Sequence, residues 1–522
     1  MEIVDNKALV ITTRRPHLVT ECIKKSQVIE TNGDLHKVAV HWGLEEAQAL
    51  AKLKVKKVPS PIVRDYDWPG VFPPMTHQKD TASFLTLNKR AFCFNEQGTG
   101  KTASAIWAAD YLMKTGKIRR ALIICPLSIM QSAWQADLFK FAVHRKVGVA
   151  YGERTKRKAV IATDAEFVII NYDGIEIVAE DIINGGFDLI IIDEANAYKT
   201  PTTKRWKTLN AILKAHQDMW LWMMTGTPAA QNPTDAYGLA KMCVPDNVPR
   251  FFGAFRDMTM YNVSKFRWLP KPNSNQVVFD ALQPAIRYTK EQCIDLPEIT
   301  YVFRDAPLTP QQEKYYKILK KQMLMVAAGE EISTVNAATN LNKLLQISGG
   351  AVYADNGSVI EFDVSNRLRV IQEVIDEASQ KVLVFVPFTH TIELLREHLR
   401  GEGITCEVIN GAVPVTKRTD IFRRFQEADD IKVLLIQPQA AAHGVTLTAA
   451  NVIIWYAPVT SIETYLQANA RIHRKGQKNP MTIVHIKGSP VETRLYQMLQ
   501  NKLDVHEKII DLYQSEISEE NT

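Results

Sequence analysis

One octapeptide constrains the fold of this chain more than any other stretch. It runs from Asn95 to Thr102 and has the sequence N-E-Q-G-T-G-K-T. The apolar run Arg90–Phe94 before it predicts a short buried strand, and the alanine-rich stretch Ala103–Leu112 after it has helical periodicity. A strand, a glycine loop and a helix opening with Gly-Lys-Thr are typical of a phosphate-binding loop. Asn95 replaces the first glycine of that pattern, so the octapeptide alone also fits an ordinary tight turn before a helix.

The residue types of this loop suit a phosphate. Gly98 and Gly100, with Thr99 between them, would let backbone N–H groups point at phosphate oxygens, and the helix N-terminus adds positive potential. Lys101 would reach the β- and γ-phosphates, and the Thr102 hydroxyl would ligate magnesium. These five residues are the expected nucleotide-binding residues of the loop.

A later apolar strand supplies two carboxylates. The run Phe187–Ile192 predicts a buried strand that delivers Asp193 and Glu194 at its carboxyl end. Asp193 would hold magnesium, and Glu194 would act as general base on the attacking water. Asp-Glu at a strand end can also cap the next helix, but its position after the glycine loop, in the same sheet pattern, favours a nucleotide site.

The pattern of apolar runs predicts the domain organisation and an α/β fold. Residues 1–70 indicate a small α+β module that closes in a proline-rich stretch. From 71 to 300 strands and amphipathic helices alternate, as in a mainly parallel sheet. Residues 301–364 predict a helical linker, and 365–522 a second α/β unit without a glycine loop of its own.

Composition restricts the class of protein. The chain has 522 residues with a net charge of +6, which permits a polyanionic partner without requiring one. No apolar run approaches the roughly 18 residues of a membrane span, so no membrane partner is expected. The six cysteines include no C-x-x-C pair, which argues against a structural zinc site. Two basic clusters fit either a solvated surface or a nucleic-acid backbone: Lys52, Lys54, Lys56 and Lys57, and Arg154, Lys156, Arg157 and Lys158.

A basic motif lies in the second α/β unit. It runs from Gln467 to Gln477 with the sequence Q-A-N-A-R-I-H-R-K-G-Q. Arg471 and Arg474 are three residues apart, so on a helix they would share one face. Two guanidinium groups on one face suit the phosphoryl group of a bound nucleotide, although a basic helix end is the alternative.

The order of these motifs resembles the Swi/Snf-type ATPases, the DNA translocase branch of the superfamily-two helicases. The matching segments, in chain order, are His77-Gln78, Asn95–Thr102, Cys125–Ser128 with Trp134, Asp193–Asn196, Thr225–Pro228 with Gln231-Asn232, Leu296–Glu298 followed by Leu308–Gln311 and Tyr315, Gly444–Leu447 with Ala449-Ala450, and Gln467–Gln477. They cover roughly residues 71–500. Gln78 resembles the adenine-reading glutamine of that family.

The resemblance implies two RecA-like P-loop lobes that bind ATP and magnesium. Gln467, Arg471 and Arg474 would then act at the γ-phosphate, with the two arginines as arginine fingers. The expected partner is double-stranded or forked DNA, bound by a monomer, and the expected activity is ATP-dependent translocation. The expected location is cytoplasmic and nucleoid-associated for a prokaryotic or viral protein, and nuclear for a eukaryotic one.

Two alternatives and several departures accompany the resemblance. A strand-separating helicase and a degenerate, non-enzymatic DNA-binding scaffold are the rival functions. Asn196 stands where the family usually has histidine, which would weaken the coupling between hydrolysis and translocation rather than hydrolysis itself. Ala441–His443 replaces a glycine-rich approach to the Gly444 motif. The lack of long insertions favours a compact repair, fork-processing or phage-type enzyme over a nucleosome remodeller.

Overall fold

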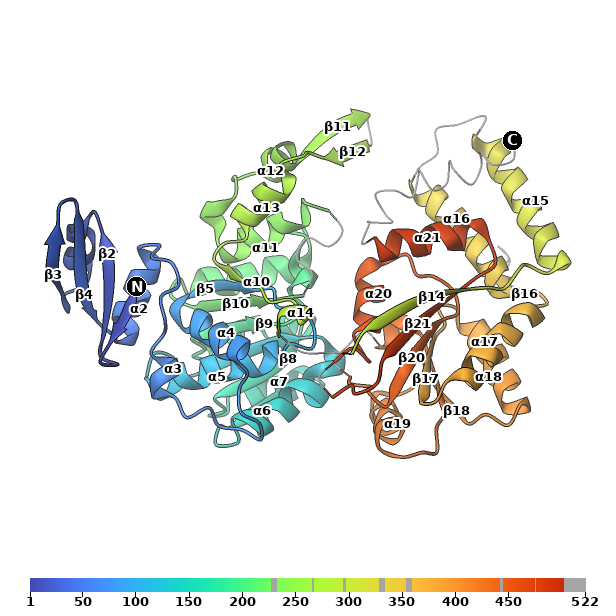
Figure 1. The fold of residues 1–522 in the computed structure, drawn as a ribbon, viewed down its shortest axis with the longest axis horizontal. Coiled ribbons are helices and arrows are strands. Elements are labelled where there is room, and N and C mark those ends of the chain that lie inside the picture. The colour runs from blue at the N-terminus through green and yellow to red at the C-terminus, as the bar shows by residue number, and fades with distance from the viewer. Residues whose placement is uncertain are drawn as a thin grey trace. The chain divides into compact units, whose positions relative to one another are not determined.

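The chain divides into two units, Met1–Ala229 with Pro233–Cys293 and Ala230–Asn232 with Ile294–Thr522. The structure, a computed structural model, describes residues 1–226, 232–264, 267–293, 297–327, 334–353, 359–441, 445–474 and 476–501. Each unit is built on a parallel sheet, and the first also carries the N-terminal module (Figure 1).

The N-terminal module is a four-stranded antiparallel sheet with two helices. The sheet has the order β1-β2-β4-β3, with β1 Glu2–Val4, β2 Ala8–Thr13, β3 Ser26–Asn32 and β4 Leu35–His41, and the helices are α1 Pro16–Cys22 and α2 Leu44–Lys52. Alternate residues of β2 and β4 are buried and pack with the helices, so one face of the sheet forms the module's core. Trp42 Nε1 donates to Pro59 O at 2.8 Å and Gln48 Nε2 to Thr86 O at 2.9 Å, which connect the module to the following helices.

The first unit is organised around a seven-stranded parallel sheet. Its order is β13-β5-β10-β9-β6-β8-β7. The strands are β5 Arg90–Cys93, β6 Ala121–Cys125, β7 Val147–Ala150, β8 Phe167–Asn171, β9 Leu189–Ile192, β10 Trp220–Met224 and β13 Ala285–Ile286. Successive residues of the central strands enter two different cores, one on each face of the sheet. Burial on both faces explains why these strands have continuous apolar sequences rather than alternating ones.

Helices cover both faces of this sheet, and a hairpin extends from the unit. The helices are α3 Ile62–Asp65, α4 Thr76–Leu87, α5 Lys101–Lys114, the π-helical η2 Met130–Gln135, α6 Ala136–Phe141, α7 Arg154–Ile161, α8 Gly174–Ile177, α9 Ala179–Asn184, α10 Lys204–Ala215, α11 Asp235–Cys243, α12 Phe252–Thr259, α13 Ser274–Ala281 and α14 Lys290–Cys293. The hairpin pairs β11 (Met260–Ser264) with β12 (Arg267–Pro270).

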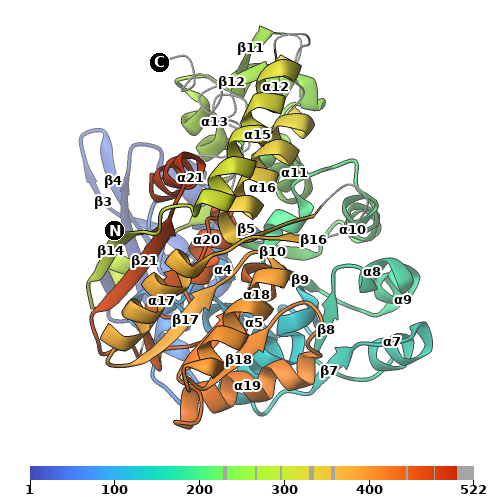
Figure 2. The ribbon, with the colours of Figure 1, turned by 90° about the vertical axis from the view of Figure 1, so that its right-hand side faces the viewer.

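The second unit has a six-stranded parallel sheet of its own. Its order is β14-β21-β20-β17-β19-β18, with β14 Ile299–Asp305, β17 Lys381–Phe385, β18 Cys406–Ile409, β19 Val433–Ile436, β20 Ala450–Trp455 and β21 Met481–Lys487. Its helices are α15 Pro310–Ala327, α16 Thr334–Gly349, α17 Ser365–Glu377, α18 Thr389–Gly401, α19 Val415–Glu427, α20 Ile462–Asn469 and α21 Pro490–Gln500. A short pair, β15 (Ala351–Tyr353) and β16 (Val359–Glu361), follows α16. Helices α15 and α16 pack against each other (Figure 2).

A buried ion pair connects the helices of the second unit. Both oxygens of the Glu492 carboxylate accept from Arg367 Nη2, at 2.8 and 2.9 Å, and the two side chains are 0% and 3% exposed. Glu492 also accepts the N–H groups of Gly488 and Ser489 at the start of α21. These donors satisfy the carboxylate oxygens in the core.

Among the described residues, no helix is both long and apolar enough to span a bilayer.

Candidate nucleotide site

The glycine loop lies between β5 and α5, as the sequence predicts. Gly98 and Gly100 have φ angles of +87° and +82°, and Lys101 is the first residue of α5. Left-handed glycines at this point turn the chain so that the first N–H groups of the helix face outward from its N-terminus. The Thr99 side chain donates to Glu96 O at 2.8 Å, which holds the loop closed on itself.

Residues of α4 cover this loop. His77 Nε2 lies 2.8 Å from Thr99 O, so this nitrogen carries the proton and donates. Gln78 accepts from Met75 N through Oε1, and its Nε2 lies 3.4 Å from Thr99 O. A Cβ on Gly100 would lie only 2.0 Å from Gln78 Nε2, so glycine is the residue that lets this side chain cross the loop. The structure thus places Gln78 against the glycine loop.

Asn95, which replaces the first glycine of the usual pattern, has a structural role. Its side chain is buried; Nδ2 donates to Thr81 Oγ1 at 2.8 Å, and Oδ1 accepts from Tyr288 N at 3.0 Å. The amide therefore connects the loop to α4 and to the segment after β13. A glycine here could make neither contact.

Lys101 provides the test of whether the loop fits a phosphate. The residue is 8% exposed, and its Nζ has no hydrogen-bond partner within the described ranges. An ammonium group in such a place is unfavourable unless an anion accompanies it. The phosphate oxygens of a nucleotide at the N-terminus of α5 would supply that anion, while Thr102, the second residue of the helix, would face the same site.

Asp193 follows β9 and is held by a tryptophan. Trp134, fully buried on η2, donates from Nε1 to Asp193 Oδ2 at 2.9 Å, and Glu194 N donates to Oδ1 at 3.0 Å. The Tyr172 hydroxyl donates to Asp193 O at 2.6 Å. Burial, and then the charges of Asp193 and Glu194, raise the pKa of Tyr172 well above its usual value, so the hydroxyl keeps its proton. These contacts orient a carboxylate suitable for magnesium.

Glu194 lies next to the glycine loop in an uncommon backbone conformation. Its φ is +49°, in the left-handed region that non-glycine residues seldom adopt. Gln97 Nε2, from the loop, donates to Glu194 Oε1 at 3.2 Å. A Cβ on Gly226, just after β10, would lie 3.5 Å from Gln97 N. Because β5, β10 and β9 are adjacent, the glycine loop, the Asp193-Glu194 pair and the start of the Thr225-Gly226 segment meet at the carboxyl edge of one sheet.

The prediction that Arg471 and Arg474 share one face of a helix is wrong. Helix α20 ends at Asn469, so Arg471 and Arg474 lie on the turn that follows it. Both nevertheless reach the same segment: Arg471 Nη1 donates to Val445 O at 3.3 Å, and Arg474 Nη1 to Thr446 Oγ1 at 3.3 Å. The Arg474 Nε also donates to Ala470 O at 3.0 Å and so satisfies a carbonyl near the helix end.

Gln467 lies on α20 and is largely buried, with Nε2 donating to Glu463 Oε1 at 3.2 Å. Asn196 lies in the turn Ala195–Tyr198 after Glu194. Several residues of the motifs lie outside the described residues: Thr227, Pro228, Gln231, Leu296, Ala442, His443, Gly444 and Lys475.

The two basic clusters differ in their environment. Lys52, Lys54, Lys56 and Lys57 are all exposed. In the second cluster Arg157 is buried and donates to Gly152 O, Ala150 O and Asn171 Oδ1. Arg157 therefore supports the fold, and Arg154, Lys156 and Lys158 remain at the surface.

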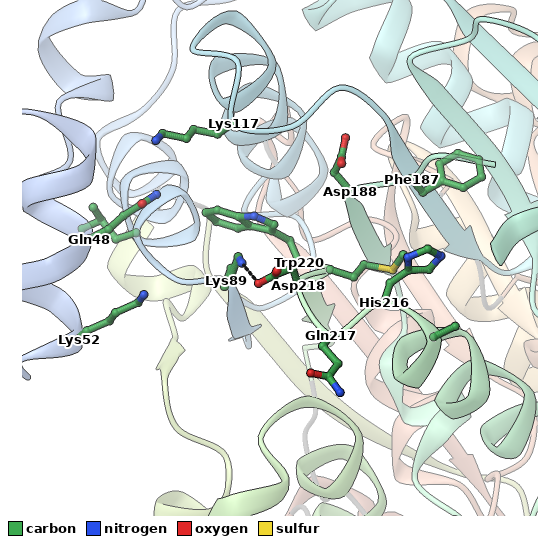
Figure 3. Close-up of a pocket in the computed structure, with 13 residues that line it drawn as sticks. Gln48, Lys52, Lys89, Lys117, Phe187, Asp188, His216, Gln217, Asp218 and Trp220 are labelled. Carbon is green, nitrogen blue, oxygen red and sulfur yellow. Dashed lines mark hydrogen bonds and ion pairs between the residues drawn. The ribbon is translucent and has the colours of Figure 1, made fainter. Parts of the chain in front are cut away.

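A cavity of about 750 Å³ lies elsewhere on the first unit (Figure 3). Much of its lining comes from segments that precede strands, including Lys89 before β5, Lys117 before β6 and Asp188 before β9. It is thus at the amino edge of the sheet, opposite the glycine loop. Lys89 pairs with Asp218 at 2.9 Å and Lys117 pairs with Glu45, so these two ammonium groups already have carboxylate partners.

Comparison with known proteins identifies the family. The SNF2-related domain matches residues 75–348, and the helicase conserved C-terminal domain matches residues 366–476. An uncharacterized ATP-dependent helicase of Mycoplasma genitalium is 25% identical over 426 residues, which are 80% of this chain and 40% of that protein. A chromodomain-helicase-DNA-binding protein 1-like of Danio rerio is 23% identical, over 83% of this chain and 44% of its own length. The chain therefore spans less than half the length of these relatives.

A relative of similar length and a solved structure also match. Putative protein p41 of Acyrthosiphon pisum secondary endosymbiont phage 1 is 24% identical, over 80% of this chain and 93% of that protein. The Sulfolobus solfataricus SWI2/SNF2 ATPase core in complex with dsDNA is 22% identical with a TM-score of 0.41, over 87% of this chain and 97% of that one. Since the SNF2-related domain alone spans more than half of the residues and the C-terminal helicase domain follows it, the chain belongs to the SNF2-related family and has its two RecA-like lobes.

Proposed function

We propose that this protein is a DNA-dependent ATPase that uses ATP hydrolysis between its two lobes to translocate on double-stranded DNA. The observation that carries the proposal is Lys101 at the N-terminus of α5, whose buried ammonium has no hydrogen-bond partner among the residues that the structure describes. It lies at the same edge of the sheet as Asp193 and Glu194. An ammonium that can bind an anion, at the same sheet edge as two carboxylates, suits phosphoryl transfer.

The residues of the first lobe have separate roles in this proposal. The N–H groups of the loop from Gly98 to Gly100 and the ammonium of Lys101 bind the phosphates, and Gln78 reads the adenine. Magnesium, when held by Thr102 and Asp193, neutralises charge on the β- and γ-phosphates. Trp134 keeps Asp193 in place through its 2.9 Å hydrogen bond.

Glu194 is the general base in the hydrolysis step. The oxygen of water bonds to the γ-phosphorus while one of its protons passes to the Glu194 carboxylate. The bond from the γ-phosphorus to the bridging oxygen breaks, and its electron pair leaves with ADP. Arg471 and Arg474 of the second lobe stabilise the charge that develops on the phosphoryl oxygens, with Gln467 nearby.

DNA binding would rest on contacts with phosphates. Exposed basic side chains at Lys52–Lys57 and around α7 fit such contacts. Binding should therefore be sensitive to salt and independent of sequence. The names of the relatives, which include ATP-dependent helicases and a core in complex with dsDNA, support the choice of DNA as partner.

The direct test is ATP hydrolysis by the purified protein with no nucleic acid, single-stranded DNA, duplex DNA or a forked duplex. Stimulation by duplex or forked DNA is the expected result. Stimulation by single strands alone, together with strand displacement, would favour a strand-separating helicase. No hydrolysis under any condition would contradict the proposal and favour a non-enzymatic scaffold.

Arg474→Ala tests the role of the second lobe. An arginine finger contributes roughly 10³–10⁵-fold to turnover, so hydrolysis should nearly vanish while binding of a fluorescent ATP analogue persists. Arg369→Ala is the matched control, because this arginine of α17 is 70% exposed and remote in sequence from the motifs. Normal turnover in Arg474→Ala would refute the arginine-finger assignment.

A further inference from the structure

The side-chain amide of Gln97 lies beside Glu194. One end of the amide makes a hydrogen bond there, and for the other end no partner is found among the described residues. Its Nε2 donates to Glu194 Oε1 at 3.2 Å. Because a carboxylate only accepts hydrogen bonds, this contact establishes that the nitrogen end of the amide faces Glu194. The other end, Oε1, is buried and has no hydrogen-bond partner among the residues that the structure describes.

The backbone around Gln97 keeps the amide in this position. The loop is closed on one side by the Thr99 side chain, which donates to Glu96 O at 2.8 Å. On the other side lies Gly226, where an added Cβ would be 3.5 Å from Gln97 N, an ordinary van der Waals distance. Glu194, in its left-handed conformation, follows an aspartate that Trp134 holds. Both partners of the Gln97–Glu194 contact are thus positioned by separate elements of the first lobe.

A buried amide oxygen normally receives a hydrogen bond. The oxygens of a triphosphate are acceptors and cannot supply one. A water molecule beside Glu194 can, because it has two O–H groups and the general base takes only one of them. The chemistry of the two side chains therefore matches a single water molecule held between a carboxylate and an amide oxygen.

We propose that Gln97 orients the attacking water together with Glu194. This inference rests on the proposed ATPase function and adds a residue to its reaction. One O–H of the water points at the Glu194 carboxylate, which takes the proton as the oxygen bonds to the γ-phosphorus. The other O–H donates to Gln97 Oε1 and stays on the phosphate product. Gln97 itself gains and loses no proton.

The substitution Gln97→Met tests this, because methionine has nearly the same length and no hydrogen-bonding amide. We expect DNA-stimulated kcat to fall about 10- to 100-fold, the usual cost of a misplaced reacting group, with KM for ATP unchanged. The matched control is Gln217→Met, at an exposed glutamine of the same lobe on the opposite edge of the sheet. It should hydrolyse ATP as the wild type does.

Two phosphate analogues separate a role in the reaction from a structural one. ADP–beryllium fluoride imitates bound ATP, whereas ADP–aluminium fluoride imitates the transition state with its axial water. Gln97→Met should bind the first normally and lose affinity for the second by the same factor as kcat. An equal loss of affinity for both analogues would show that Gln97 only shapes the loop. A raised magnesium requirement with both analogues would show that Oε1 contacts the metal. Either result would overturn the inference.

The wild type distinguishes failure of this inference from failure of the proposed function. If the wild type hydrolyses ATP and Gln97→Met matches it in kcat and in both affinities, the role of Gln97 is refuted and the ATPase stands. If the wild type neither hydrolyses ATP nor binds ADP–aluminium fluoride, the proposed function is refuted, and the role of Gln97 with it.

Discussion

The hydrogen bond from Trp134 to Asp193 gives a prediction that the structure makes quantitative. Trp134 is fully buried, and its Nε1 lies 2.9 Å from Asp193 Oδ2. Substitution by phenylalanine removes this donor and leaves the carboxylate with Glu194 N, at 3.0 Å, as its other donor. The ring of phenylalanine is also smaller, so the substitution leaves a small cavity beside Asp193.

Two effects of Trp134→Phe should follow. A hydrogen bond to a charged group contributes about 1.5–3 kcal/mol, so with the cavity we expect the first lobe to lose about 2–4 kcal/mol of unfolding free energy. Removal of a group that orients a metal ligand typically lowers metal affinity about 10- to 100-fold. The magnesium concentration that half-activates ATP hydrolysis should rise by that factor.

Trp222→Phe is the matched control. Trp222 is also fully buried, belongs to the same hydrophobic core as Trp134, and donates from Nε1 to Asn88 O at 3.1 Å. The substitution removes a similar volume and one hydrogen bond, but it does not touch Asp193. It should destabilise the lobe without changing the magnesium requirement.

The assay is a magnesium titration of ATP hydrolysis, with thermal unfolding of both variants measured in parallel. A Trp134→Phe protein with the magnesium dependence of the wild type would refute the argument that the tryptophan positions a metal ligand. An equal shift in Trp222→Phe would refute it as well, because the effect would then follow from lost packing.

Two further predictions concern other buried groups. Lys101→Met replaces an ammonium that lacks a partner in the described structure, so the nucleotide-free protein should gain about 1 kcal/mol of unfolding free energy. Differential scanning fluorimetry should show no stabilisation of this variant by magnesium–ATP. Stabilisation like that of the wild type would contradict the role of Lys101 in nucleotide binding. Burial lowers the pKa of His485 to about 3, below its unfolded value of about 6.5. As the pH is lowered, the unfolded chain therefore takes up the proton first. The free energy of unfolding should decrease once the pH is under about 6.5, and the loss should be about 2 kcal/mol at pH 5. His485→Gln, which keeps a polar partner for Tyr465, should remove this loss in urea unfolding of the second lobe at pH 7 and pH 5; an unchanged loss would assign it to other groups.

The central strands of the first sheet were predictable because burial on both faces leaves a continuous apolar sequence. The stretches Ala121–Cys125, Phe167–Asn171, Leu189–Ile192 and Trp220–Met224 are uninterrupted apolar runs or nearly so, and each is fully buried. Strand β14 is different: it lies at the edge of the second sheet, and several of its side chains, Tyr301 and Phe303 among them, are exposed. Such an edge strand lacks the apolar continuity that marks a central one.

The arginine segment shows where a local pattern fails. A spacing of three residues predicts one helical face only if the helix continues, and α20 ends at Asn469. Arg471 and Arg474 then reach Val445 and Thr446 from a turn. The contact between the two motifs depends on how the segments pack, so residue spacing alone could not predict it.

The sequence by itself determined the local chemistry of the site: a strand, a glycine loop with Lys101, a helix, and a later strand ending in Asp193-Glu194. Each of these depends on neighbouring residues, whose periodicity and conformational preferences are visible in the chain. The tertiary structure alone decided that Trp134 holds Asp193, 59 residues away, and that Gln97 contacts Glu194, 97 residues away. These pairs exist because β5, β10, β9 and β6 are adjacent, an order set by the packing of the whole sheet.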